Sequence, residues 1–153
     1  MIDPVPSEAV VTAWARLLRA QAKVLGAVES ALKQHGFPPL AWYDILLELR
    51  RAEGGKLRPV EIEGHLLLAQ HNVSRLVDRL EAAGYVERRP HPEDGRSQDV
   101  VIVEAGRDLL RRMWPVYAAA IERHIGAQLA DEAEAQLLSA ILGKLIAGPN
   151  PNL

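Results

Sequence analysis

The feature that most constrains the fold of this 153-residue chain is one amphipathic segment, residues 70–83, which ends at a glycine. On a helical wheel of about 100° per residue its apolar side chains gather on one side. These side chains are Val73, Leu76, Val77 and Leu80. The pattern predicts a helix that docks one face on a core, with Gly84 as its left-handed C-terminal cap.

Two short β-type runs follow this helix directly. Residues 86–89 are extended in character, residues 90–97 are rich in turn-forming residues, and residues 99–103 form an apolar β-branched run. A two-stranded hairpin with a polar tip, which is a wing, is therefore expected over about 86–103. A short helix over 59–67 and a turn at 68–69 precede the amphipathic helix. The order predicts a winged helix-turn-helix lobe over 40–103.

Helical patterns flank this lobe on both sides. Residues 7–35 and 104–129 carry apolar stripes at spacings of three and four, and Ser7 and Gly36 are expected to cap the first of them. Pro115 is expected to kink the second helix. Asp131 and Glu134 approximate a capping box that opens a last helix, which ends near residue 147. The predicted fold is mainly α with a small β-hairpin wing.

The terminal helices, 7–35 and 104–147, are strongly apolar on one face. A lone subunit would leave long apolar stripes uncovered, so we expect these helices to form a dimer surface. The alternative is that the stripes pack on each other within one bundle.

The outward face of the 70–83 helix has the chemistry of a DNA reader. Arginine can grip guanine O6 and N7 with two hydrogen bonds, and asparagine can grip adenine N6 and N7 in the same way. N-terminal residues of a recognition helix reach deepest into the major groove. The expected base contacts are Gln70, His71, Asn72 and Arg75, with Ser74 on bases or phosphates and Arg79 on a phosphate. The alternative is a solvated helix with ordinary salt pairs.

The expected wing adds cations at its base, Arg88 and Arg89, and one at its tip, Arg96. An arginine at a loop tip can enter a narrow, electronegative minor groove. Asp94 is an unfavourable neighbour for a phosphate backbone, unless it orients an arginine through a charge-assisted bond. The alternative is that Asp94 belongs to a plain Asp-Gly turn.

Charge and composition limit the function classes. The chain has a net charge of −2, and residues 56–96 hold seven cations and seven anions, so DNA contact must come from where the charges point. The chain has no cysteine, which excludes disulfides and thiolate metal sites. There is no apolar run long enough to span a bilayer and no secretory signal, so a cytoplasmic location without membrane contact is expected.

The sequence contains no motif that is typical of an enzyme or of a metal site. No pair of the five histidines shows i, i+4 spacing with a carboxylate on one helix, so no metal site is expected. No phosphate-binding loop, nucleophile elbow or catalytic carboxylate pair occurs, so we expect neither an enzyme nor a cofactor.

Several of these segments resemble the MarR family of transcriptional regulators. Residues 57–66 resemble the first helix of that family's helix-turn-helix, and residues 73–88 resemble its recognition helix and first wing strand. Asp94-Gly95-Arg96 matches the family's Asp-x-Arg wing motif, and residues 103–106 resemble the start of its long helix. The order of elements matches over almost the whole chain, which is then a single MarR-like domain, 1–153. The central block is the specific part.

The resemblance implies a triangular homodimer whose terminal helices intertwine. Its two winged lobes would bind successive major grooves of a pseudo-palindromic double-stranded DNA operator and so regulate nearby genes, most often by repression. A small aromatic or phenolic ligand, bound in a crevice beside the dimerisation helices, would relieve this repression. Trp14, Trp42, Trp114 and Tyr117 lie on helices that would border this crevice, although packing in the core or dimer is the alternative for each.

Three departures from the family pattern bear on DNA binding. Ala69 stands where the family supplies a serine cap, Glu63 and Gly64 weaken the first short helix, and Val103-Glu104 replaces a Leu-Thr cap. These departures and the balanced charge favour an alternative function. In that alternative the chain is a winged-helix dimer that binds a small molecule or a protein without recognising an operator.

Overall fold

The computed structural model describes residues 3–68 and 72–149 and divides into two compact units. One unit, Val28–Ala118, is the winged lobe, and the other comprises Met1–Ala27 and Ala119–Leu153. Among the described residues, no helix has the length and apolar character needed to cross a membrane.

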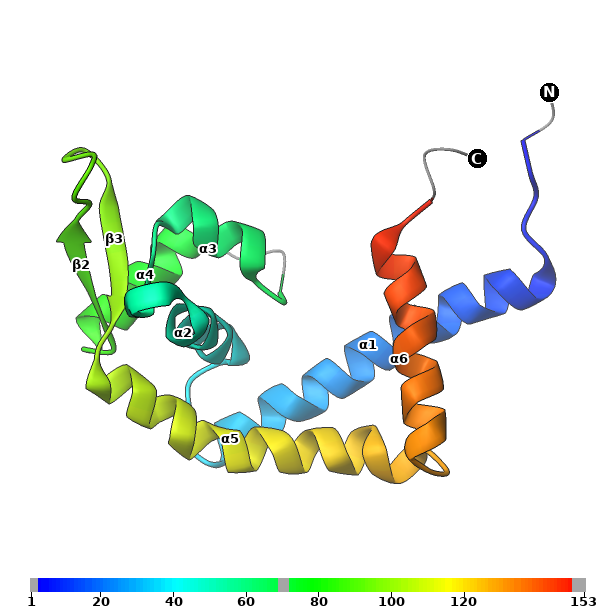
Figure 1. Cartoon of the computed structure of the whole chain (residues 1–153). Coiled ribbons are helices and arrows are strands. Elements are labelled where there is room, and N and C mark those ends of the chain that lie inside the picture. The colour runs from blue at the N-terminus through cyan, green and yellow to red at the C-terminus, as the bar shows by residue number, and fades with distance from the viewer. Residues whose placement is uncertain (1–2, 69–71, 150–153) are drawn as a thin grey trace. The chain divides into compact units, whose positions relative to one another are not determined.

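The winged lobe has the element order that the sequence predicts (Figure 1). Its helices are α2 (Leu40–Arg51), α3 (Pro59–His65) and α4 (Val73–Ala82), with a short 3-10 turn, η1, at Glu53–Gly55. Its strands are β1 (Lys56–Leu57), β2 (Val86–Pro90) and β3 (Gln98–Ile102). The three strands form one antiparallel sheet in the order β1-β3-β2, in which Val86 is paired with Ile102 and Arg89 with Asp99.

The structure confirms the predicted two-stranded hairpin, β2 and β3, and adds a third strand to its sheet. Lys56 and Leu57 pair with Val101 and Val100 of β3, so a third strand joins the hairpin to the segment that follows α2. Two residues are too few to show the alternation that identifies a strand from sequence. The pairing therefore became visible only in three dimensions.

The core of the lobe is built around α2. Ile45, Leu46 and Leu49 are each 0% exposed, as are Ile62 of α3 and Leu80 of α4. Their burial stabilises the lobe by about 25 cal/mol for each Å² of apolar surface that is removed from water. α2 therefore supports both helices of the helix-turn-helix.

α4 begins later and is capped better than the sequence suggested. Asn72 is its N-cap, and the side-chain Oδ1 accepts a hydrogen bond from the Arg75 amide at 3.1 Å. The expectation of a missing cap is therefore wrong: asparagine is among the best N-cap residues. The predicted cap position, Ala69, lies outside the described residues, as do Gln70 and His71. Gly84 ends the helix with φ +82°, as predicted.

The remaining elements are helical. α1 spans Glu8–Gln34, α5 spans Glu104–His124 and α6 spans Glu132–Ala147, with a 3-10 turn, η2, at Gly126–Gln128. The Ser7 hydroxyl accepts from the Val10 amide at 3.3 Å, and the Asp131 carboxylate accepts from the Glu134 amide at 2.9 Å, which confirms both predicted caps. α5 is continuous through Pro115 and ends at His124, short of the predicted residue 129.

Candidate nucleic-acid interface

The outer face of α4 is polar and open to solvent. Ser74, Arg75, Asp78 and Arg79 are exposed, whereas Val73 and the rest of the predicted apolar stripe are buried. The inner face thus fixes the rotation of the helix about its axis. That rotation directs Arg75 and Arg79, one turn apart, away from the core, as the helical wheel predicts.

The Asn72 side chain caps α4, in addition to the base contact predicted for it. Its Oδ1 is engaged with the Arg75 amide, which leaves the Nδ2 group to donate. A bidentate grip on adenine needs the amide oxygen to accept and the amide nitrogen to donate at the same time. In this conformation the Nδ2 group can still donate to DNA, while the Arg75 amide occupies one of the two acceptor positions on Oδ1.

Arg88, predicted to contact DNA, is engaged inside the lobe. Its guanidinium donates to Asp78 at 2.6 Å and to Glu81 at 2.8 Å, and its backbone amide donates to Glu81 at 3.0 Å. Burial lowers the pKa of this guanidinium, but the hydrogen bonds to Asp78 and Glu81 raise it by more, so Arg88 stays charged. We call this set of three side chains the α4–β2 clamp, because it ties the recognition helix to the first wing strand.

Arg89 points the other way from the same strand. It pairs with Glu87 at 2.8 Å, and both side chains are more than half exposed. Exposed pairs of this kind contribute about 0–1 kcal/mol, so Arg89 can exchange Glu87 for a phosphate at little cost.

The wing loop is ordered by Asp94. Its Oδ1 accepts from the backbone amide of Arg96 at 3.0 Å, and its carbonyl accepts from the Ser97 amide at 3.0 Å. In the described part of the chain, Asp94 forms no ion pair with an arginine side chain, so the interpretation as a plain turn describes it better. The turn leaves the Arg96 side chain exposed at the tip.

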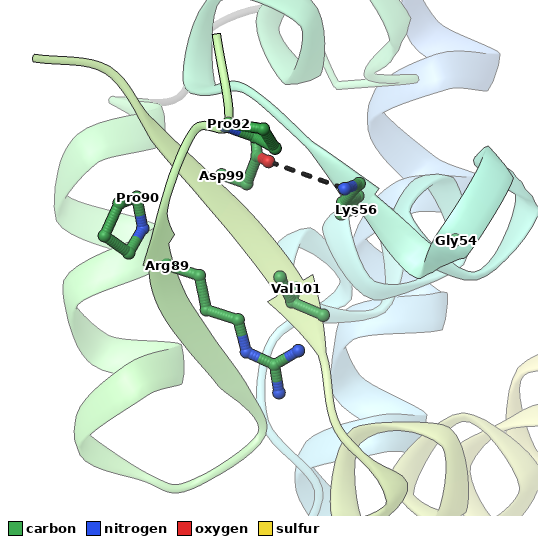
Figure 2. Close-up of a pocket in the computed structure, with 7 residues that line it drawn as sticks. All are labelled: Gly54, Lys56, Arg89, Pro90, Pro92, Asp99 and Val101. Atoms are coloured by element: carbon green, nitrogen blue, oxygen red, sulfur yellow. Dashed lines mark ion pairs between the residues drawn. The ribbon is translucent and has the colours of Figure 1, made fainter. Parts of the chain in front are cut away.

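A buried carboxylate that the sequence analysis did not single out lies at the base of the wing. Asp99 is 5% exposed, with Lys56 Nζ 3.8 Å and His91 Nε2 3.9 Å from its oxygens. Figure 2 shows Lys56 and Asp99 facing each other beside a cavity of about 220 Å³. The cavity is lined by Gly54, Lys56, Arg89, Pro90, Pro92, Asp99 and Val101. This ion pair fastens the hairpin to β1.

The ion pairs show which of the seven cations in residues 56–96 are neutralised within the fold. Four of the seven cations have carboxylate partners within the lobe: Lys56, Arg58, Arg88 and Arg89. Among the residues that the structure describes, the three that have none are Arg75, Arg79 and Arg96. Within this stretch, the cations that the described residues leave without a carboxylate partner thus lie on the outer face of α4 and at the wing tip.

The aromatic residues predicted to bind a ligand fall into separate groups. Trp114 and Tyr117 of α5 pack against Tyr43 of α2, with ring centroids 6.4 and 5.1 Å from the Tyr43 ring. Trp42 instead meets the edge of Tyr85 at 6.1 Å. Trp14 belongs to the other unit and is 60% exposed. Tyr43 was not among the predicted ligand contacts, yet its ring contacts both Trp114 and Tyr117.

The cluster of Tyr43, Trp114 and Tyr117 is only partly enclosed, since Trp114 remains 50% exposed. Burial raises the pKa of Tyr117, and the neighbouring Tyr43 and Asp44 raise it further. The phenol is therefore neutral at physiological pH and able to donate a hydrogen bond.

The described residues contain no group of three or more histidine or acidic side chains that could hold a metal ion. Two histidines have other partners: His35 Nδ1 lies 2.8 Å from the Ala31 carbonyl, and His91 Nδ1 accepts from the Glu93 amide at 3.1 Å. These contacts give both imidazoles local structural roles.

Comparison with known proteins gives consistent relatives for this architecture. The model of the MarR family matches residues 35–97, which hold most of the winged lobe. The uncharacterized HTH-type transcriptional regulator YkoM of Bacillus subtilis is 31% identical over 102 residues, covering 67% of this chain and 64% of YkoM. PrsX, an HTH-type transcriptional regulator of Escherichia coli, is 31% identical over 69% of this chain and 62% of its own length. The chain thus spans less than two thirds of these relatives.

Solved structures extend the similarity to the terminal helices. Sco3205, a MarR family transcriptional regulator from Streptomyces coelicolor solved in complex with DNA, has a TM-score of 0.81 and 24% identity over 97% of this chain and 92% of its own. Sco5413, from the same organism and family, has a TM-score of 0.77 and 28% identity over 92% and 95%. BpsR of Bordetella bronchiseptica, whose DNA binding is regulated by 6-hydroxynicotinic acid, has a TM-score of 0.78 and 19% identity over 95% and 100%.

Proposed function

Because this chain belongs to the MarR family, we propose that it is a homodimeric transcription regulator that binds double-stranded DNA through α4 and the wing. One observation carries the proposal: within residues 56–96, Arg75, Arg79 and Arg96 are the cations without a carboxylate partner among the described residues. Phosphates and guanine edges supply the acceptors that these arginines lack.

Each contact residue has a distinct role in this proposal. Arg75, in the first turn of α4, reads a guanine in the major groove, and Ser74 beside it binds a base or a phosphate. Arg79, one turn further, binds a phosphate, Arg96 enters the minor groove, and Arg89 binds the backbone that flanks it. The α4–β2 clamp and Asp94 hold these elements in place. Gln70 and His71 complete the predicted set of base contacts.

The homodimer is supported by apolar surface on the terminal helices. None of the residues of α6 is buried, although its mean hydropathy is that of an apolar helix. Large apolar side chains exposed on α1 and α6 are Val10, Val11, Trp14, Leu18, Leu137, Leu138, Ile141, Leu145 and Ile146. A second copy of the chain would cover this surface and present two lobes to half-sites about 34 Å apart.

We further propose that the regulator represses its genes and that a small aromatic ligand relieves repression. The relative BpsR responds to 6-hydroxynicotinic acid, an aromatic acid. In this chain the half-exposed Trp114, with Tyr117 and Tyr43, offers ring faces on which such a ligand can stack, and Trp42 and Trp14 are the other predicted contacts. The ligand would favour a dimer whose lobe spacing does not match the groove repeat.

The test is a titration of the full chain against fluorescent DNA from the region flanking its own gene, read by anisotropy at two salt concentrations. Selective binding of a dimer that weakens steeply with salt supports the proposal. Replacing Arg96 by Ala should weaken binding and flatten the salt dependence, whereas Arg112→Ala, an exposed arginine paired with Asp108 at 3.1 Å, should change neither. A folded dimer that prefers no DNA sequence, there or in a random pool, would favour the alternative of an interaction module.

A further inference from the structure

Asp44 is a buried carboxylate in the middle of α2. It is 6% exposed and lies between Tyr43 and Ile45, which are 5% and 0% exposed. Burying a carboxylate is unfavourable unless hydrogen bonds replace its hydration. Its Oδ2 accepts a hydrogen bond from the backbone amide of Leu68 at 3.0 Å. The bond joins residues 24 positions apart in the chain.

The Leu68 amide lies at a decisive place in the helix-turn-helix. The residue follows α3, which ends at His65, and precedes Asn72, the N-cap of α4. Apolar packing gives this segment little support, because none of residues 63–68 is buried and Leu67 is 73% exposed. The Asp44 carboxylate therefore anchors a segment that has no buried side chain of its own.

We propose that Asp44 is a positioning residue for DNA binding. It ties the central helix α2 to the chain between the two helices of the DNA-binding motif. The inference rests on the proposed function, since it deepens the account of how α4 is presented to the groove. A carboxylate oxygen accepts a hydrogen bond from an amide more strongly than a neutral carbonyl oxygen does, so the bond orders the chain after α3 at Leu68 before DNA arrives. Without it, that ordering has to occur on binding, which lowers affinity.

The chain offers a matched control for this role. Glu29 is also a partly buried carboxylate, and its Oε1 accepts from the backbone amide of Leu40 at 2.8 Å, at the start of α2. Removal of either carboxylate deletes one charge-assisted bond to a backbone amide. Only the Asp44 bond reaches the segment that leads into α4.

The experiment compares Asp44→Ala, Asp44→Asn and Glu29→Ala in the full chain, at a temperature at which circular dichroism shows each to be folded. The first readout is the Kd for the DNA that the wild type binds. The second is the exchange rate of the Leu68 amide proton by NMR, which needs no DNA. Asp44→Leu fills the site with an apolar side chain of similar size and replaces the alanine variant if that one does not fold.

Asp44→Ala is expected to raise the Kd about tenfold, equivalent to about 1.4 kcal/mol, and to speed Leu68 exchange. Asp44→Asn keeps an oxygen acceptor and should restore most of both, whereas Glu29→Ala should lower stability and leave the Kd unchanged. An unchanged Kd in Asp44→Ala, or an equal loss in Glu29→Ala, overturns the proposal. If the wild type binds no DNA, the proposed function fails, and unchanged Leu68 exchange would separately refute the anchor.

Discussion

Replacement of Arg88 by Ala distinguishes an arginine that holds the lobe together from one that binds DNA. Arg88 donates to Asp78 at 2.6 Å and to Glu81 at 2.8 Å, and its side chain is 22% exposed. The substitution removes both charge-assisted bonds of the α4–β2 clamp. It also leaves two carboxylates of the recognition helix without a cation.

The size of the effect follows from the exposure of the two acids. Hydrogen bonds to charged groups contribute about 1.5–3 kcal/mol each when buried. Asp78 and Glu81 are 63% and 41% exposed, so water solvates them once the arginine is gone, and each bond is closer to the value of about 0.2–1 kcal/mol for surface pairs. For the two bonds together, the expected loss in free energy of unfolding is therefore about 0.4–2 kcal/mol.

The assay is a double-mutant cycle of Arg88→Ala and Asp78→Ala, followed by urea unfolding and by DNA titration. A coupling energy of about 0.5–1 kcal/mol is expected for the pair. DNA affinity should fall in Arg88→Ala, because Asp78 and Glu81 then repel phosphates, and Asp78→Ala in the same chain should recover part of it. A coupling energy near zero, together with a salt slope shallower by about 2 per dimer, would show that Arg88 binds phosphate and would refute the clamp.

Three further predictions follow from single positions. Asn72→Ala removes the side-chain cap of α4 and should lower the free energy of unfolding by about 1 kcal/mol, whereas Asn72→Asp should retain it, as measured by urea unfolding. Gly106→Ala would place a methyl group against the Tyr85 carbonyl and should lower the melting temperature, while Gly64→Ala, which meets no atom within 4 Å, should not. Arg75→Ala should relax sequence preference at one position in each half-site, seen by selection from a randomised operator; an equal loss on all sequences would assign Arg75 to phosphate.

Local patterns were sufficient for much of the lobe. The apolar stripe of α4, the glycine that ends it and the hairpin that follows are dictated by neighbours in sequence, and the structure contains all three. Asp131 caps α6 for the same reason, since its acceptor and the Glu134 donor are three residues apart. Periodicity and capping act over one or two turns, which a sequence displays directly.

The features that escaped prediction depend on contacts between distant residues. β1 becomes a strand only because Val100 and Val101 lie beside it. Arg88 was assigned to DNA from its charge, yet Asp78 and Glu81 reach it from α4 across a turn. The partner of Asp44 is the backbone amide of Leu68. Every residue except proline has such an amide, so the identity of the side chain at position 68 does not reveal the bond. Charge alone does not reveal whether a cation has a partner inside the fold.

The central claim is that Arg75, Arg79 and Arg96, the cations of residues 56–96 without a carboxylate partner in the described part of the chain, bind the DNA. Its most direct test is the salt dependence of DNA affinity for the wild type and for the variant with all three replaced by Ala. The dimer would lose six cationic contacts, so the slope of log K against log salt should flatten by up to about 5, with selective binding abolished and the melting temperature unchanged. A triple variant that keeps the affinity and salt slope of the wild type would contradict the account.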